Sequence, residues 1–272
     1  MNGLLIYDSI GAKRNEWFIN SLISNFRNKN IDLELTIIDN EEIKKIENID
    51  FAIVRTIAPK INSILEDTGI RVFNNFNTAL IANDKWKTYL LCKSLEVPTM
   101  PTYQDIRSVD LHKFPYIIKS CNGHGGTEVF WLDNLGKLIS MKNYFQSLDK
   151  KFIIQKPCSE LGKDMRIYVM GNEIIASVLR YNPNSFKSNY SIGGKVQKVN
   201  PTNYHMDIVK KIISYLKSDY IGIDFIFDNG KWVLNEIEDV VGARMLYEVT
   251  HIDIANKYCS YIKSNLNMDN KC

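Results

Sequence analysis

Short apolar runs alternate with segments of helical spacing over the first 82 residues, and this alternation restricts the chain to few folds. The apolar runs are Leu4–Tyr7, Leu35–Ile38, Phe51–Val54 and Arg71–Phe73, and the expected helices are Asn15–Phe26 and Glu41–Ile46. Such alternation is typical of a parallel sheet covered by helices, so we predict an α/β fold at this end of the chain. Asp8 and Arg55 follow two of these strands, at the edge where open α/β sheets bind ligands.

The sequence also excludes several classes of function. No glycine-rich dinucleotide fingerprint follows the first strand, where residues 9–12 read SIGA, so a Rossmann-type oxidoreductase is disfavoured. Lys and Arg total 34 against 31 for Asp and Glu, which gives no electrostatic case for nucleic acid or an anionic membrane. No apolar run approaches the roughly 18 residues of a membrane span, and no signal peptide is visible. The five cysteines are scattered without a C-x-x-C pair, which favours a reducing cytoplasm over a disulfide framework or a zinc site.

A second unit follows a helix that we expect at Thr78–Leu95. Two prolines, Pro98 and Pro101, end this helix and mark a lobe boundary. Beyond them we expect strands at Tyr116–Lys119, Glu128–Leu132 and Phe152–Gln155, with a helix at Leu135–Leu148. The pattern predicts a small lobe of three strands and one helix.

The remaining sequence predicts a larger β-rich unit. The expected strands are Met165–Met170, Glu173–Arg180, Val196–Val199, Ile221–Phe227 and Trp232–Ile237, and the expected helices are Tyr204–Leu216 and Asp253–Lys263. Gly171-Asn172 between the first two strands is a hairpin signal, which predicts antiparallel pairing there.

Three carboxylates converge at a predicted hairpin, GIDFIFDNGKWVLNEIED at 222–239. Asp224 and Glu236 are each six positions from Gly230 in its DNG turn, so a regular hairpin places them opposite each other. Side chains alternate between the two faces of a strand, so Glu238 shares their face. Three unpaired carboxylates repel one another, and a hard divalent cation such as Mg²⁺ would relieve the repulsion. A solvated polar face with nearby Lys or Arg is the alternative.

A glycine-rich loop lies between two predicted strands of the small lobe. Gly123, Gly125 and Gly126 follow Lys119, which ends the preceding strand. Glycines let backbone N–H groups approach a phosphate, and a lysine adds positive charge. The loop therefore predicts a phosphate site, with a merely flexible turn as the alternative.

A polar stretch from 163 to 194 contains further charged residues. Asp164 and Arg166 share one face of a predicted strand, so both can point into a cleft, with a surface salt bridge as the alternative. Arg180 ends an apolar strand, and Lys187 and Asn189 follow in the loop. Cationic groups that face a carboxylate-bound metal are the general arrangement for phosphoryl transfer, so the three signals together favour that chemistry.

The order and spacing of these motifs resemble the ATP-grasp superfamily, most closely the carboxylate–amine ligases typified by the ribosomal-protein-S6 glutamate ligase. The resemblance runs from about Asn75 to the final helix. It rests on the stretches NFNTALIANDKWKT, PYIIKSCNGHGGTEVF, IIQKPCSELGKDMRIYVMGNEIIASVLR, FKSNYSIGG, GIDFIF, VLNEIEDVVG and THIDIANKY. It implies that two lobes, 85–156 and 157–272, clamp ATP and that a Rossmann-like α/β lobe, 1–84, precedes them.

The resemblance also implies a role for each site residue. The nucleotide phosphates would contact Lys85, Lys119 and the loop of Gly123, Gly125 and Gly126, and the adenine would be read by the backbone of Gln155, Lys156, Pro157 and Cys158. Asp164 would lie near the ribose or on the acceptor side of the cleft. The acyl phosphate would face Arg166 and Arg180, and the transferred phosphoryl group would be supported by Lys187 and Asn189. Two Mg²⁺ ions, with Mn²⁺ as an alternative, would be held by Asp224, Glu236 and Glu238.

Three positions depart from the family pattern. Glu238 stands where the family usually has Asn, which adds a negative charge, and Lys187 stands where it usually has Arg, which loses a bidentate fork. Arg244 follows the metal motif in place of the family's proline–glycine. We expect Arg244 either to clamp a substrate carboxylate or the acyl phosphate, or to pair with Glu238 or Asp239.

The activity that the resemblance implies is ATP-dependent ligation of a carboxylic acid to an amine. The acid would attack the γ-phosphate of ATP, and the amine would attack the resulting acyl phosphate, with release of ADP and phosphate. The expected partners are a small-molecule acid and amine, and neither nucleic acid nor membrane; a peptide or protein acceptor and a homo-oligomer stay open. The alternatives are an ATP-grasp kinase that phosphorylates a small molecule and a non-catalytic ATP-binding module.

Overall fold

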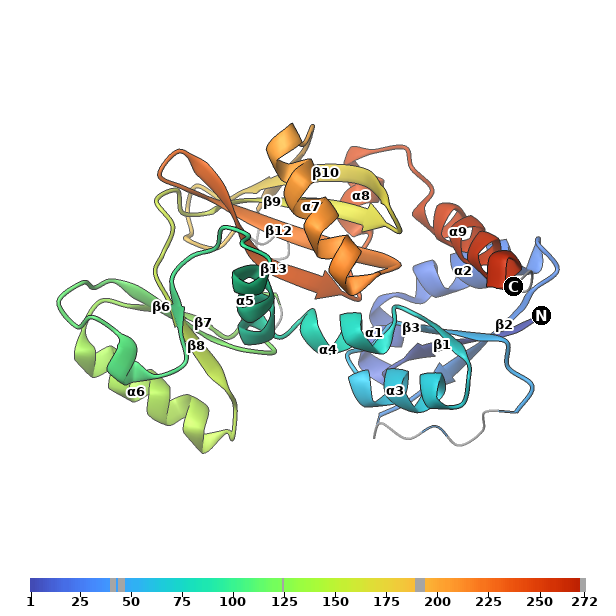
Figure 1. The fold of residues 1–272 in the computed structure, drawn as a ribbon, viewed down its shortest axis with the longest axis horizontal. Coiled ribbons are helices and arrows are strands. Elements are labelled where there is room, and N and C mark those ends of the chain that lie inside the picture. Colours follow the sequence, from blue (N-terminus) through green and yellow to red (C-terminus); the bar gives the residue numbers. More distant parts are fainter. Residues whose placement is uncertain (40–42, 44–46, 124, 189–193, 270–272) are drawn as a thin grey trace.

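The described residues form three separate β-sheets (Figure 1). The structure is a computed structural model that describes residues 1–39, 43, 47–123, 125–188 and 194–269. The sheets have the strand orders β2-β1-β3-β4, β5-β8-β6-β7 and β11-β10-β9-β12-β13. One sheet lies in each of the three predicted lobes, and the boundaries at 84 and 156 stay predictions.

The first sheet is parallel, as the sequence predicts. Its strands are β1 (Asn2–Tyr7), β2 (Asp32–Ile37), β3 (Phe51–Val54) and β4 (Arg71–Phe73), and its helices are α1 (Ser9–Arg14), α2 (Glu16–Arg27) and α3 (Pro59–Asp67). Alternate residues of β1 pack on opposite faces, Leu5 against α2 and Leu4 against α3. The sequence analysis missed α3, in which Ile61 and Leu65 form one short apolar stripe. The helix predicted at Glu41–Ile46 lies outside the described residues, apart from Ile43, which is in no helix or strand.

The single helix predicted at Thr78–Leu95 is wrong, because the chain forms two helices there. These are α4 (Phe76–Ile81) and α5 (Lys85–Ser94). Asn83 between them has a φ of 66°, and its N–H donates to Ile237 O at 2.9 Å. The carboxylate of Asp84 accepts hydrogen bonds from the backbone N–H groups of Trp86 and Lys87, at 2.9 and 3.0 Å. A new helix therefore begins at this N-cap, which satisfies donors that a continuous helix would have paired internally.

The second sheet is antiparallel and carries one long helix. It contains β5 (Thr102–Tyr103), β6 (Tyr116–Ser120), β7 (Val129–Leu132) and β8 (Phe152–Gln155), with a 3₁₀ turn at Ile106–Ser108 and the helix α6 (Leu135–Ser147). Leu138 and Phe145 of α6 are buried against Tyr116, Ile118 and Ile154 of the strands. On the other face of this sheet, Ile117, Lys119 and Val129 line a pocket.

The third sheet is antiparallel, and its two faces differ. It contains β9 (Lys163–Met170), β10 (Glu173–Tyr181), β11 (Lys195–Val199), β12 (Tyr220–Asp228) and β13 (Lys231–Asp239). Ile167 and Val169 of β9 pack with Ile212 of α7 (Asn203–Leu216) on one face. On the other face, Tyr168 and Met170 join the core shared with the first sheet, while Asp164 and Arg166 border the candidate site.

The end of the chain returns to the first sheet. After β13 come α8 (Arg244–Val249), which the sequence analysis missed, and α9 (Ile254–Asp269). Figure 1 shows α9 beside α2, and Tyr258 and Ile262 of α9 lie in the same buried cluster as Leu22 and Phe26 of α2. The core of the N-terminal lobe is thus completed from the far end of the sequence. Within the described residues, no helix is both long and apolar enough to cross a membrane.

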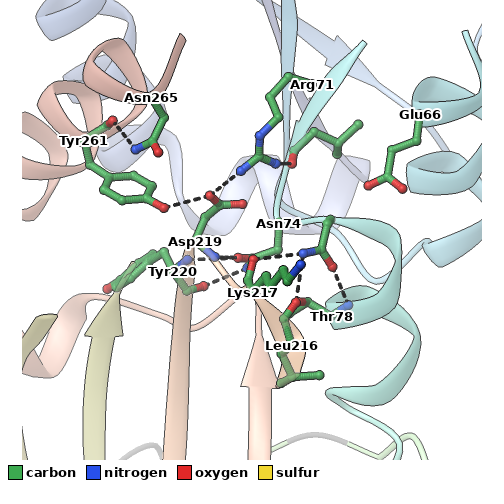
Figure 2. A network of polar contacts seen from close by, with 12 residues as sticks. Glu66, Arg71, Asn74, Thr78, Leu216, Lys217, Asp219, Tyr220, Tyr261 and Asn265 are labelled. Carbon is green, nitrogen blue, oxygen red and sulfur yellow. Dashed lines mark hydrogen bonds and ion pairs between the residues drawn. The ribbon is translucent and has the colours of Figure 1, made fainter. Parts of the chain in front are cut away.

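A network of polar contacts joins the first sheet, the third sheet and α9 (Figure 2). Asp219 lies just before β12, and its carboxylate accepts from Arg71 Nη2 at 2.6 Å and from Tyr261 Oη at 2.8 Å. Asn74 exchanges hydrogen bonds with the backbone of Tyr220, at 2.8 and 2.9 Å. These buried contacts fix the orientation of the N-terminal lobe against the large sheet.

Candidate active site

The second and third sheets border a common pocket that is partly open to solvent. Most of the predicted site residues line the pocket: Lys85, Lys119, Gly123, Gly125, Gly126, Gln155, Lys156, Pro157, Cys158, Asp164, Arg180, Lys187 and Glu236. Arg166, Asp224 and Glu238 adjoin it through ion pairs. The structure thus brings together residues that lie far apart in the sequence.

Two buried lysines stand at one wall of the pocket. Lys85 begins α5, and its Nζ donates to Gly123 O at 2.7 Å and lies 3.3 Å from Glu236 Oε2. Lys119 near the end of β6 donates to Asn235 Oδ1 at 3.1 Å. Burial lowers the pKa of Lys119 to about 8, and the positive charge of Lys85 acts in the same direction, against the attraction of Glu236. The wall is therefore rich in hydrogen-bond donors for an anion.

The glycine loop covers these lysines with its backbone. A Cβ on Gly123 would lie 2.9 Å from Glu128 Oε2, so a larger residue would displace that side chain. Gly125 and Gly126 have φ values of 63° and 74°, in the left-handed region that favours glycine. Lys187 Nζ donates to Gly126 O at 2.6 Å, which ties the loop to the opposite lobe. His124 lies outside the described residues.

The segment predicted to read adenine connects the two lobes. Gln155 ends β8, and its side-chain amide donates to Thr102 Oγ1 at 2.9 Å. Lys156 Nζ lies 4.0 Å from the centre of the Tyr116 ring. The side chains of Gln155 and Lys156 are thus held by the second sheet, while residues 155–158 line the pocket.

The carboxylate cluster forms as predicted, but by a less regular hairpin. Asp224 lies opposite Glu236, and oxygens of Asp224, Glu236 and Glu238 all lie within 4.8 Å of one another. The two-residue turn is Asn229-Gly230, which by itself would place Asp224 opposite Asn235. A β-bulge at Asn235, between the pairs Phe225–Leu234 and Asp224–Glu236, shifts the register by one residue and restores the predicted pair. The prediction of a regular hairpin is therefore wrong, and the predicted pairing of Asp224 with Glu236 is confirmed.

Two arginines connect the carboxylates into one buried chain of charges. Arg166 donates to both oxygens of Asp224 at 2.7 Å and to Glu238 Oε1 at 2.5 Å. Arg180 donates to Asp224 Oδ2 at 2.6 Å and pairs with both oxygens of Asp164. Asp164 and Arg166 do share a face, as predicted, but Asp164 pairs with Arg180. The surface salt bridge that was the alternative is wrong, because all these groups except Glu238 are buried.

The carboxylates of this cluster differ in how strongly the two arginines compensate their charge. Burial would raise the pKa of Asp224, but Arg166 and Arg180 outweigh it and lower the pKa to about 2. At Asp164 and Glu238 burial prevails over the arginines and raises the pKa of each carboxyl group. Asp224 is thus the most firmly ionised member, as expected for a carboxylate that accepts from two guanidinium groups.

Two predicted residues stand apart from this cluster. Arg244 at the start of α8 is exposed, and within the described part of the chain it pairs with neither Glu238 nor Asp239. Its role as a clamp stays a prediction. Asn189 lies outside the described residues.

The sequence analysis missed the apolar walls and two polar residues of the pocket, Ser188 and Asn235. The additional lining residues include Ile117, Val129, Leu161, Phe186, Ser188, Ile226 and Asn235. Strict alternation along β13 would turn Asn235 away from Glu236, but the bulge places both on the pocket side. A signal was present, because the inward-facing residues Leu234 and Ile237 are three apart, which regular alternation does not allow.

Comparisons with known proteins agree with this arrangement. A family model described as the RimK-like ATP-grasp domain matches residues 82–262. An uncharacterised protein of Mycoplasma genitalium is 28% identical, over 97% of this chain and 96% of that protein. The glutamate–LysW ligase of Sulfolobus acidocaldarius is 26% identical, over 82% of this chain and 84% of that protein. N-acetylaspartylglutamate synthase A of Homo sapiens is 27% identical, over 80% of this chain and 60% of that protein.

Solved structures show the same fold. The D-alanine–D-alanine ligase of Bacillus anthracis has a TM-score of 0.75 at 16% identity, with 100% of this chain and 99% of that chain covered. A RimK domain ATP-grasp protein of Sphaerobacter thermophilus has a TM-score of 0.73 at 14% identity, with 96% of this chain and 99% of that chain covered. The ATP-grasp fold expected from the sequence is therefore confirmed.

Proposed function

Because the chain belongs to the RimK-like ATP-grasp family and is an ATP-dependent carboxylate–amine ligase, we propose that its central pocket binds Mg²⁺–ATP and joins an acidic amino acid to a second substrate. The observation that carries this proposal is the meeting of two buried lysines, a glycine loop and three carboxylates at one pocket. Each of these groups suits one part of a metal-bound nucleotide.

We assign the nucleotide phosphates to the wall of Lys85, Lys119 and the glycine loop. Lys85 already donates to a carbonyl of that loop, so phosphate oxygens bound there would find both ammonium groups beside the loop backbone. The adenine would lie against residues 155–158, with Asp164 near the ribose or on the acceptor side. An ATP-dependent reaction also supports a cytoplasmic location for the protein.

The carboxylate cluster fits Mg²⁺. Oxygen ligands of one octahedral Mg²⁺ ion lie about 2 Å from the metal and therefore about 4 Å or less from each other, which the 4.8 Å spread of Asp224, Glu236 and Glu238 approaches. We propose two ions, with Mn²⁺ as a substitute, because three carboxylates together with phosphate oxygens supply enough ligands. When bound, the metal ions would neutralise charge on the transferred phosphoryl group.

The remaining cationic residues would act on the reacting groups. A substrate carboxylate would attack the γ-phosphorus to form an acyl phosphate and ADP, and the amine would displace phosphate from the acyl carbon. Arg180 and Arg166 lie beside the carboxylates and would stabilise the acyl phosphate and the oxyanion that follows. We propose Lys187 and Asn189 as supports of the phosphoryl group and Arg244 as a clamp for a substrate carboxylate or the acyl phosphate.

The relatives support an acidic amino acid as one substrate. Several of them are named glutamate ligases, one of them for LysW, and another is named for the synthesis of N-acetylaspartylglutamate. The acceptor is a small molecule, a peptide or a protein terminus, and a homo-oligomer is compatible with each.

Mg²⁺-dependent release of ADP and phosphate from ATP tests the proposal. The protein is offered pooled carboxylic acids, then the same pools with amino acids and amines, and products are identified by mass spectrometry. We expect release that needs both pools and a new condensed mass. Phosphate transfer to a hydroxyl compound would instead establish the kinase, and binding of ATP without turnover in any pool would favour the non-catalytic module.

Glu236→Gln tests the metal assignment. The substitution keeps the shape of a side chain that lies 3.3 Å from Lys85 but removes the negative charge that a metal ion requires. We expect turnover to fall by at least about a thousandfold, as when a group that stabilises transition-state charge is lost. Glu34→Gln on the exposed side of β2 is the matched control and should retain full activity. Equal activity of Glu236→Gln and the control would contradict the assignment.

A further inference from the structure

A buried arginine outside the nucleotide pocket has no acidic partner. Arg55 follows β3 and is only 6% exposed. Its Nη2 donates to Val241 O at 2.9 Å, its Nε lies 3.5 Å from Tyr7 Oη, and the rings of Phe18 and Tyr220 pack against its guanidinium. Among the described residues, no carboxylate forms an ion pair with it. Asp239 attracts this charge from beyond ion-pair distance. Since no described carboxylate contacts the guanidinium directly, an anion that does so would stabilise its buried charge.

Two buried tyrosine hydroxyls in the same region also lack partners. Tyr168 and Tyr220 are both fully buried, and neither Oη has a hydrogen-bond partner among the described residues. Buried phenols ordinarily have such a partner, so these two hydroxyl groups can donate to a ligand. The pKa of Tyr220 is raised by burial and by Tyr168 and lowered by Arg55, which places both groups within electrostatic reach of Tyr220.

Both tyrosines lie on the sheet face that carries the candidate metal site. On β9, Tyr168 is the next residue after Arg166 on that face, and Arg166 lies opposite Asp224 of β12. Tyr168 lies opposite Gly222. Gly222 has no side chain that would separate Tyr168 from the loop after β13. Neighbouring positions on one face are about 7 Å apart. A row of side chains on this face therefore runs from the carboxylates past Tyr168 to Tyr220, whose ring packs against Arg55.

The loop after β13 runs from the strand that carries Glu238 to the contact with Arg55. Val240 has a φ of 68°, which a β-branched residue rarely adopts. Asp239 Oδ1 accepts from Val240 N at 2.8 Å, and Val241 O accepts from Arg55, so contacts on both sides hold this backbone. The neighbouring Gly242 is exposed and borders open space. Strained backbone that is held in this way is concentrated at ligand sites.

We propose that Arg55, Tyr168 and Tyr220 form a substrate subsite that binds a carboxylate other than the reacting one. The proposal rests on the ligase function above and deepens it. A substrate that reacts beside Asp224 and Glu236 extends along the β9–β12 face, and its second carboxylate pairs with Arg55 and accepts hydrogen bonds from the two phenols. The substrate class is a dicarboxylic amino acid or a peptide with such a terminus, and the extra carboxylate belongs to either the acid or the amine.

Titration calorimetry on the full chain tests the subsite. The protein is loaded with Mg²⁺ and a non-hydrolysable ATP analogue and titrated with L-glutamate, L-aspartate and glutarate. We expect at least one of these to bind, Arg55→Met to weaken it by about tenfold or more, and Arg55→Lys to restore part of the loss. Arg27→Met, at the exposed end of α2, is the matched control and should bind as wild type does. L-glutamine and isoglutamine then show which carboxylate Arg55 recognises.

Tyr168→Phe and Tyr220→Phe provide a test that does not depend on the folding of the arginine variants. Each removes a hydroxyl without a partner, so we expect an unchanged or higher melting temperature together with a severalfold weaker affinity for the probe. In turnover, Arg55→Met should raise the KM of the substrate that carries the extra carboxylate, acid or amine, and leave the KM of ATP unchanged. A purely structural role would move neither affinity nor this KM selectively.

Two results would overturn the subsite. One is that the analogue-loaded wild type binds none of the three probes. The other is that Arg55→Met and both phenylalanine variants bind the probe as wild type does. In either case, measured ATP turnover decides separately whether the ligase proposal stands.

Discussion

Lys119 shows how the environment of one side chain sets the conditions for nucleotide binding. It is buried at the pocket wall, its Nζ has the neutral partner Asn235, and Lys85 stands nearby. With a pKa of about 8, Lys119 is mostly charged at pH 7 but loses its proton within the ordinary working range of an enzyme. A bound phosphate would reverse this by favouring the ammonium form.

We therefore expect the affinity for Mg²⁺–ADP to fall as pH rises above about 8. The loss should approach a factor of about ten for each pH unit, because one proton must be taken up on binding. Calorimetry between pH 7 and 10 measures this slope, and Lys119→Met should bind weakly with that component absent. Lys93→Met, on the exposed side of α5, should keep the wild-type profile. A pH-independent affinity in the wild type would show that Lys119 does not contact the phosphates.

At the scale of elements, the positions of most helices and strands followed from apolar spacing, while short elements such as α3 and α8 and the irregular junctions did not. The strands β8, β9 and β10 and the helices α6 and α7 lie within two residues of their predicted ends. The break between α4 and α5 depends on Asp84 capping a new helix and on Asn83 binding a distant carbonyl, which no local pattern reveals. The bulge at Asn235 left only one trace in the sequence, the spacing of three between the buried residues Leu234 and Ile237. The unpredicted parts are thus set by tertiary contacts.

Gly162, just before β9, is a junction of this kind that carries a prediction. Its φ is 67°, and a Cβ there would lie 2.3 Å from the carbonyl oxygens of both Asn182 and Ser185. Its N–H and C=O pair with Phe186 O and Asn182 N, which fixes the segment that leads to Lys187. Gly162→Ala must therefore move that segment, and we expect both lower stability and weaker nucleotide binding.

Gly69→Ala is the matched control for this change. Gly69 has a φ of 81° and open space around its missing Cβ, so the substitution costs about 1–2 kcal/mol of backbone strain but causes no clash. Urea unfolding and Mg²⁺–ADP binding distinguish the two variants. If Gly162→Ala loses no more stability than Gly69→Ala and binds nucleotide normally, the segment from 182 to 188 is not held by this close approach.

At the scale of the whole molecule, Asp219 connects the lobes through hydrogen bonds, although its burial disfavours its negative charge. Its carboxylate is 1% exposed, and burial raises its pKa from 3.8 to about 6 although Arg71 and Tyr261 both favour the ionised form (Figure 2). Below pH 3.8 the group is protonated in both the folded and the unfolded chain. Between pH 3.8 and 6 the unfolded chain ionises first, so the free energy of unfolding must fall as pH rises.

We expect Asp219→Asn to remove this component. The interval from 3.8 to about 6 corresponds to about 3 kcal/mol, so the wild type should lose up to that amount relative to the variant between pH 4 and 6.5. Urea unfolding of both proteins at several pH values measures the difference, in which the contributions of all other titrating groups cancel. Parallel pH profiles would mean that Asp219 stays ionised in the folded protein.

The packing of α9 on α2 has a consequence for how the chain acquires its structure during synthesis. The ribosome produces the first sheet and α2 early, but the side chains of α9 that cover Leu22 and Phe26 follow only after both other sheets. Until then the nascent N-terminal lobe exposes an apolar helix face, which is the surface that chaperones bind and through which incomplete chains associate. The lobe that emerges first is therefore among the last parts of the protein to become complete.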